Sequence, residues 1–203
     1  MNPTEASPRG RRTPEEPAAP PSIGPSASRS LAALLVVNVL ATGVMLGILQ
    51  WSVFFLLQSF LASTAIVYLL ATAVWLLGSL LGMVLPGRQE ALWLAGCVGC
   101  FYGFRAVAEA HTYALAWLPL LLLLVAGMGA YAGRFFRCRA AAFPATKWLF
   151  FLENTGFVAG LLLTAVCLYW MGASFFAAAP IAAAGVTLAT GAVFMRAAPA
   201  EGP

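Results

Sequence analysis

The chain has 203 residues, of which 62% are hydrophobic and only 9% are charged, and its mean hydropathy is +0.89. Soluble domains are about half apolar and about a quarter charged, so this composition excludes an ordinary water-soluble globular domain. The net charge of +4 does not indicate nucleic-acid binding, because the basic residues lie at the ends of apolar segments rather than in one stripe.

The first thirty residues differ in composition from the rest of the chain. They contain seven of its 13 prolines, separated mainly by Ser, Gly and Ala. Such a segment cannot bury enough apolar surface to offset the entropy lost when it becomes ordered. We therefore predict a disordered, proline-rich tail over residues 1–30.

Six apolar stretches follow this tail. A helix that crosses a hydrocarbon core of roughly 30 Å needs about 20 residues. The predicted spans cover approximately residues 31–51, 64–85, 91–110, 113–133, 147–170 and 175–195, which gives a membrane domain over 31–196 and a short tail over 197–203. The stretch 52–63 is compatible with an extension of either neighbouring helix or with a position at the membrane surface. The predicted fold class is an all-α integral membrane protein, a bundle of six transmembrane helices.

The basic residues predict the orientation of this bundle. Arg105 lies inside a predicted span and Lys147 begins one, whereas the other nine basic residues lie outside the spans; a six-span threading places these nine and Lys147 on one side. Cytoplasmic loops of membrane proteins are enriched in Lys and Arg. Both ends of the chain are therefore expected in the cytoplasm.

Glycines recur four residues apart in five of the six predicted spans. Lipid gives little hydrophobic drive for helix association, so glycine pairs act by letting two backbones approach closely. We expect these pairs to pack the bundle, or to form a contact with a partner; they are Gly43/Gly47, Gly78/Gly82, Gly99/Gly103, Gly129/Gly133 and Gly156/Gly160.

Three charged residues fall inside the predicted spans, where each costs roughly 2.5–3.5 kcal/mol on insertion scales. Arg105 and Glu109 are four residues apart, so they share a helical face and are expected to form an ion pair near the outer end of the third span. The alternative for this pair is an outward-facing polar vestibule. His111, the only histidine, would then lie at its rim.

Glu153 is the third intramembrane charge, and no basic residue within the membrane is expected to meet it. Asn154 follows it directly, and Asn38 is a further polar candidate in the first span. One interpretation is that Glu153 hydrogen-bonds to a neighbouring helix or reaches the interface. The other is a carboxylate that binds a proton or a cation in a cavity open to the cytoplasm.

The sequence names no reaction and no cofactor. Cys97 and Cys100 form a CxxC, but no histidine follows and no second CxxC exists, so neither haem attachment nor a metal site is expected. The absence of aspartate, together with a single histidine, excludes HExxH and Ser-His-Asp arrangements. A thiol relay through the CxxC is the remaining enzymatic alternative, and the sequence does not favour an enzyme.

Two segments resemble a known family. They are STAIVYLLATAVWLLGSLLG at 63–82 and NTGFVAG at 154–160. They are similar to the membrane-embedded region of spermidine synthase-like bacterial proteins, which itself resembles half of a major facilitator superfamily transporter. The first glycine of the second segment comes one residue early, and the loop 86–90 keeps only fragments of the facilitator loop. The aminopropyltransferase domain is absent, so polyamine synthesis does not follow from this resemblance.

The resemblance implies a protein of the bacterial inner membrane and leaves two functions open. The first is a transporter half that moves a small cationic or proton-coupled solute as a homodimer or with a second chain, with Glu153 as the binding carboxylate. The second is a non-catalytic subunit that anchors a larger complex or binds a quinone, a pigment or a lipid. Both predict contact with the lipid bilayer and with another protein chain, and neither predicts a nucleic-acid partner.

Overall fold

The computed structural model describes residues 25–61, 65–86 and 89–197. In this part of the chain six α-helices and one 3-10 turn follow one another without a strand. The elements are α1 (Pro25–Phe60), α2 (Ala65–Val84), α3 (Glu90–Ala110), η1 (Leu115–Trp117), α4 (Leu118–Ala140), α5 (Thr146–Met171) and α6 (Ala173–Ala197). All six α-helices are long and apolar enough to cross a membrane.

Each predicted span corresponds to one helix, but two helices are longer than predicted. α1 has 36 residues, because the apolar stretch after Trp51 contains neither Gly nor Pro until Phe60 and continues the same helix. Residues 25–30, which composition assigned to the tail, form the beginning of α1. The rest of the predicted tail (1–24), the C-terminal residues 198–203 and positions 62–64 lie outside the described residues.

α4 extends to Ala140, seven residues beyond the predicted end of the fourth span at Gly133. No Gly or Pro occurs between Gly133 and Pro144, so nothing in the local sequence ends the helix there. Arg134, Arg137 and Arg139, which were predicted to lie in a loop, therefore belong to the last two turns of α4.

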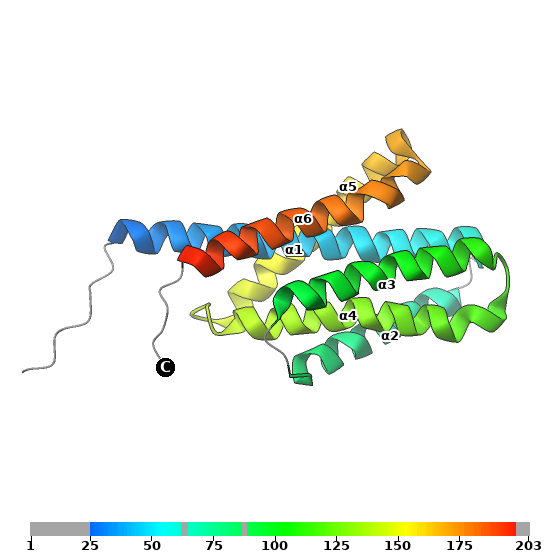
Figure 1. Ribbon diagram of the computed structural model, residues 1–203, viewed down its shortest axis with the longest axis horizontal. Helices are drawn as coiled ribbons and strands as arrows, with labels where there is room; N and C mark the ends of the chain where they lie inside the picture. Colours follow the sequence, from blue (N-terminus) through cyan, green and yellow to red (C-terminus); the bar gives the residue numbers. More distant parts are fainter. Residues whose placement is uncertain (1–24, 62–64, 87–88, 198–203) are drawn as a thin grey trace, which may run out of the picture.

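The helices associate in a pattern that repeats within the chain. The most extensive contacts join α1 to α5, α2 to α4, α1 to α6 and α3 to α4. If α1, α2 and α3 are exchanged for α4, α5 and α6 respectively, the α1–α5 contact corresponds to the α2–α4 contact. The α1–α6 contact corresponds in the same way to the α3–α4 contact. Consecutive helices alternate in direction (Figure 1), so the two three-helix units run in opposite senses.

Reciprocal glycine contacts hold the two most extensive pairs together. Gly43 and Gly47 of α1 lie against the backbone of α5, and Gly156 and Gly160 of α5 lie against the backbone of α1. A Cβ atom at any of these positions would overlap a carbonyl oxygen of the opposite helix. Glycine thus permits the close approach that the sequence pattern predicted.

The α2–α4 pair uses the same device. Gly78 and Gly82 of α2 face carbonyl groups of α4, and Gly129 and Gly133 of α4 face the carbonyl groups of Trp75 and Ser79. Four of the five predicted glycine pairs therefore pack helices within the chain.

The fifth glycine pair makes no close contact with a helix backbone in the described chain, so for this pair the alternative of a contact with a partner is left. A Cβ at Gly99 would meet nothing within 4 Å among the described residues, and one at Gly103 would touch only the side chain of Leu124, at 3.7 Å. Gly96, one turn before, also faces open space. The face of α3 at Gly96 and Gly99 is therefore open in the described part of the chain.

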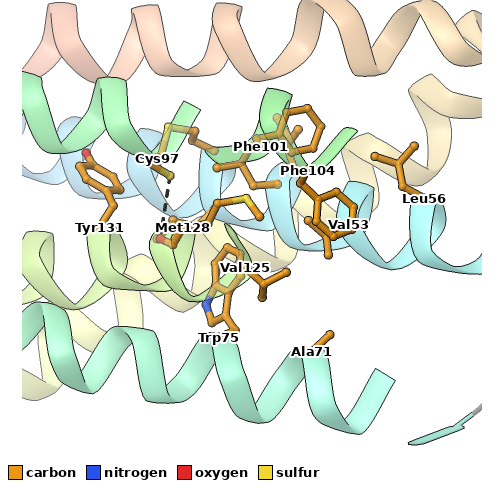
Figure 2. Close-up of a cluster of buried hydrophobic side chains, with 14 of the residues drawn as sticks. Val53, Leu56, Ala71, Trp75, Cys97, Phe101, Phe104, Val125, Met128 and Tyr131 are labelled. Carbon is orange, nitrogen blue, oxygen red and sulfur yellow. Dashed lines mark hydrogen bonds between the residues drawn. The ribbon is translucent and has the colours of Figure 1, made fainter. Parts of the chain in front are cut away.

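Large apolar side chains fill the space between α1, α2, α3 and α4 (Figure 2). Phe101 and Phe104 of α3 and Met128 and Tyr131 of α4 are fully buried there, with Trp75 of α2 beside them. This cluster lies between the two three-helix units and joins them.

Two arginines of α4 donate hydrogen bonds to carbonyl groups at the C-terminal end of α2. Arg134 Nη1 donates to the Leu85 carbonyl at 3.1 Å, and Arg137 Nη1 donates to the Met83 carbonyl at 2.8 Å. The last carbonyls of a helix lack partners within it and carry partial negative charge, so both contacts stabilise the terminus.

Candidate functional site

A cavity of about 290 Å³ lies between α1, α2, α4 and α5, and Glu153 is on its wall. Its polar lining comes from three helices: Gln50 of α1, Thr72 and Ser79 of α2, and Glu153 and Asn154 of α5. Four aromatic side chains complete the wall, namely Trp75, Phe136, Phe150 and Phe157.

The glycine packing of α1 against α5 determines where Glu153 lies. The carbonyl oxygen of Glu153 faces Gly43, so the backbone at this position is held directly against α1. The side chain is partly buried. It forms no hydrogen bond or ion pair with any other residue in the described part of the chain.

The neighbouring polar groups of the cavity are already hydrogen-bonded to their own helices. Asn154 Nδ2 donates to the Phe150 carbonyl at 2.8 Å, and Ser79 Oγ donates to the Trp75 carbonyl at 3.0 Å. Among the described residues, the side chains of Gln50 and Glu153 are the polar groups of the cavity that make no hydrogen bond, and Glu153 is the one that carries an ionisable carboxyl. A carboxylate beside several aromatic faces has the chemistry to bind a proton or an organic cation.

Asn38 does not belong to this cavity, although the sequence grouped it with Glu153. Asn38 is fully buried in a second polar cluster. Its Nδ2 donates to the Thr187 carbonyl at 3.1 Å and to Thr190 Oγ1 at 3.0 Å, and its Oδ1 accepts from Arg139 Nε at 3.2 Å. Asn38 thus links α1 to α4 and α6.

Arg139 is the centre of the second cluster, which we call the Arg139 cluster (Asn38, Glu90, Arg139, Thr187 and Thr190). Its Nη2 donates to both carboxylate oxygens of Glu90, at 2.9 and 2.8 Å, and it is only 4% exposed. Its guanidinium carbon lies 5.5 Å from the ring centre of Phe135 and 5.3 Å from that of Phe194. The charge is therefore paired, hydrogen-bonded and covered by aromatic faces.

The sequence did not predict this cluster, because it placed Arg139 and Glu90 in loops. One signal was available: no Gly or Pro lies between Gly133 and Pro144, so the sequence is compatible with a helix that extends past Gly133 and includes Arg139. Nothing in one sequence shows that Arg139 and Glu90 face each other.

Arg105 and Glu109 form the predicted ion pair within α3. The Nε–Oε1 distance is 2.6 Å, and both side chains are partly exposed. The pair lies at the end of α3 opposite to Glu90. The ring of His111 stacks on Trp117 with a centroid distance of 4.2 Å.

The CxxC cysteines are separate thiols. Cys97 is buried, with its sulfur 3.9 Å from the Met128 carbonyl, whereas Cys100 is partly exposed. Among the described residues no group of three or more His, Cys, Asp or Glu side chains is arranged to hold a metal ion.

Comparisons with protein-family models, with curated proteins and with solved structures found no match. The function is therefore argued from the geometry of this chain.

Proposed function

We propose that this chain is a multi-pass protein of the bacterial inner membrane, with both ends in the cytoplasm and the architecture of a transporter half. In this proposal two copies face each other and move a small cationic or proton-coupled solute. Glu153 is the group that binds the proton or the cation.

The repeated helix pairing supports this proposal. Inverted three-helix repeats are a recurrent basis of transporter folds, including the six-helix halves of facilitator transporters, because the two repeats can rock about a site between them. In this chain the main helix contacts of α1–α3 correspond to those of α4–α6. Each three-helix unit also contributes one pair of glycines to the α1–α5 contact and one to the α2–α4 contact.

The Glu153 cavity is the observation that carries the proposal. It opens on the face formed by α1, α2, α4 and α5, which includes helices from both repeats. An unpaired carboxylate in an apolar segment is costly and marks an ion or proton pathway. A second copy facing this surface would enclose the cavity and shield it from lipid.

A proteoliposome assay tests the proposal. The purified protein is reconstituted with a pH-sensitive dye inside and an imposed pH gradient, and methylammonium, choline and tetraethylammonium are supplied outside. We expect cation-dependent dissipation of the gradient, at least tenfold slower with Glu153→Gln. Glu109→Gln, which changes a paired carboxylate, should stay within twofold of wild type. Full activity of Glu153→Gln, or no response to any of the cations, would contradict the proposal.

A second candidate function is supported by the open glycine face of α3. A Cβ at Gly96 or Gly99 would meet nothing within 4 Å in the described chain, and Gly96 lines a groove of about 440 Å³ together with Trp93, Cys100 and Gly127 among others. Small residues on an open face suit a helix from another membrane protein. In this alternative the chain is a non-catalytic subunit that anchors a complex or holds a quinone, pigment or lipid.

A further inference from the structure

A second large cavity, of about 580 Å³, lies beside the Arg139 cluster. Its walls come from the beginning of α3 and the ends of α4 and α6. This volume falls within the range of about 300–1,000 Å³ that is typical of ligand pockets. The Glu153 cavity lies elsewhere, since the two cavities share no lining residue.

The inner wall of this cavity carries groups for a ligand with two opposite charges. Arg139 and Glu90 both line it and together contribute no net charge. The first turn of α3 also lines it, and Gln89 makes no side-chain cap bond to that turn. The first backbone N–H groups of α3 therefore lack helical acceptors and favour a negative group.

An unsatisfied hydroxyl lies in the same wall. Thr187 lines the cavity and is 1% exposed, yet its Oγ1 has no hydrogen-bond partner among the described residues. Buried hydroxyl groups are normally paired, and an unpaired one costs about 1–3 kcal/mol. A ligand that brings polar atoms into this cavity would remove that cost.

The outer wall is apolar and open. Leu92 of α3 and Leu188 and Met195 of α6 line the cavity and are 65%, 48% and 63% exposed. Arg196 follows Met195 at the end of α6, on the side where the arginines of α4 also lie. In the membrane placement proposed above, this side corresponds to the cytoplasmic leaflet, and the cavity faces lipid at headgroup level.

We propose that this cavity binds the headgroup of a zwitterionic phospholipid with a primary ammonium group, of the phosphatidylethanolamine class. The phosphate lies toward Arg139 and the first turn of α3, and the ammonium donates to Glu90. The acyl chains follow Leu92, Leu188 and Met195. Charge selects this occupant, because Glu90 would repel a purely anionic headgroup and a trimethylammonium group offers no N–H donor. The inference rests on the membrane placement but not on transport.

Lipid binding to the purified, delipidated protein tests this inference by native mass spectrometry. The probes are phosphatidylethanolamine, phosphatidylglycerol and phosphatidylcholine with identical acyl chains. We expect phosphatidylethanolamine to bind at least tenfold more tightly than either of the others. Equal or tighter binding of phosphatidylglycerol, or no binding of phosphatidylethanolamine, would overturn the inference.

Two variants of α6 locate the site without disturbing the ion pair. Ala192 is exposed and lines the cavity, so Ala192→Trp should fill it and weaken phosphatidylethanolamine binding at least tenfold. Val193 is exposed but does not line the cavity, so Val193→Trp should change binding less than twofold. Equal effects of the two variants would place the lipid elsewhere.

A charge change tests the role of Glu90. Glu90→Gln keeps one acceptor oxygen but removes the negative charge that attracts the ammonium and repels an anion, so the preference should move toward phosphatidylglycerol by at least fivefold. An unchanged preference would contradict the assignment of Glu90. The lipid-binding experiment does not measure transport. If the protein does not select phosphatidylethanolamine, the transport proposal for Glu153 is unaffected, and if no transport through Glu153 is found, the lipid-binding proposal is unaffected.

Discussion

Two ion pairs in this chain have different surroundings. Arg139 and Glu90 join different helices, and Arg139 is nearly inaccessible, with Asn38 and two aromatic rings around it. Arg105 and Glu109 lie four residues apart on one helix and remain partly exposed. Removing one partner of a buried pair leaves a desolvated charge, whereas an exposed pair contributes little.

At the residue scale we therefore predict unequal costs for two similar substitutions. Arg139→Gln should lower the free energy of unfolding by on the order of 3 kcal/mol, because it leaves Glu90 without its cation and the Oδ1 atom of Asn38 without its donor. Arg105→Gln should cost less than about 1 kcal/mol. Reversible unfolding by sodium dodecyl sulfate in mixed micelles measures both. Equal costs would mean that the Arg139 cluster does not hold α1, α3 and α4 together.

Sequence reasoning reached some of these residues and missed others for a physical reason. The Arg105–Glu109 pair was predictable because both partners lie on one helix at a spacing of four. The Arg139 cluster was not, because its members are far apart in sequence and meet only through packing of α1, α3, α4 and α6. Glu153 could be identified as a carboxylate without a predicted partner in an apolar span, but its aromatic surroundings depend on which helices face it.

At the scale of helices, glycine determines which elements approach most closely. The α1–α5 and α2–α4 contacts each bring four glycines against opposing carbonyl groups. A glycine on an open face has no such role and only lowers helix propensity. The chain contains both kinds at the same spacing, which provides a matched comparison.

We predict that Gly133→Ala and Gly99→Ala change stability in opposite directions. At Gly133 the added methyl group would overlap the Ser79 carbonyl, so the helices must separate at a cost of about 1–3 kcal/mol. At Gly99 it meets nothing within 4 Å, and the better helix propensity of alanine should add up to about 1 kcal/mol. The same unfolding titration measures the pair. Destabilisation by Gly99→Ala would show that α3 packs against a partner in the purified state.

The number and order of the helices followed from the sequence, because apolar runs of the required length are local signals. The ends of α1 and α4 did not follow from hydropathy, since a helix continues past its apolar segment when no Gly or Pro stops it. The glycine pairs predicted close packing without predicting partners. The same spacing occurs in α4, where the pair packs against α2, and in α3, where it meets no helix backbone in the described chain.

At the scale of the whole molecule, the repeat and the cavity define a surface. The α1, α2, α4 and α5 face carries the Glu153 cavity, and exposed apolar side chains such as Leu76 surround it. The second cavity, formed by α3, α4 and α6 beside the Arg139 cluster, lies on another part of the bundle. A transporter half needs a partner on the first face, whereas an anchoring subunit would use the open glycine face of α3.

Cysteine cross-linking in native membranes tests this central claim most directly. In a chain without its native cysteines, a single cysteine replaces Leu76 on the cavity face or Gly99 on the open face of α3. The account predicts that a short bifunctional thiol reagent gives covalent dimers with Leu76→Cys and leaves Gly99→Cys monomeric. Dimers with Gly99→Cys alone, or monomers with both variants, would contradict two copies facing each other across the Glu153 cavity.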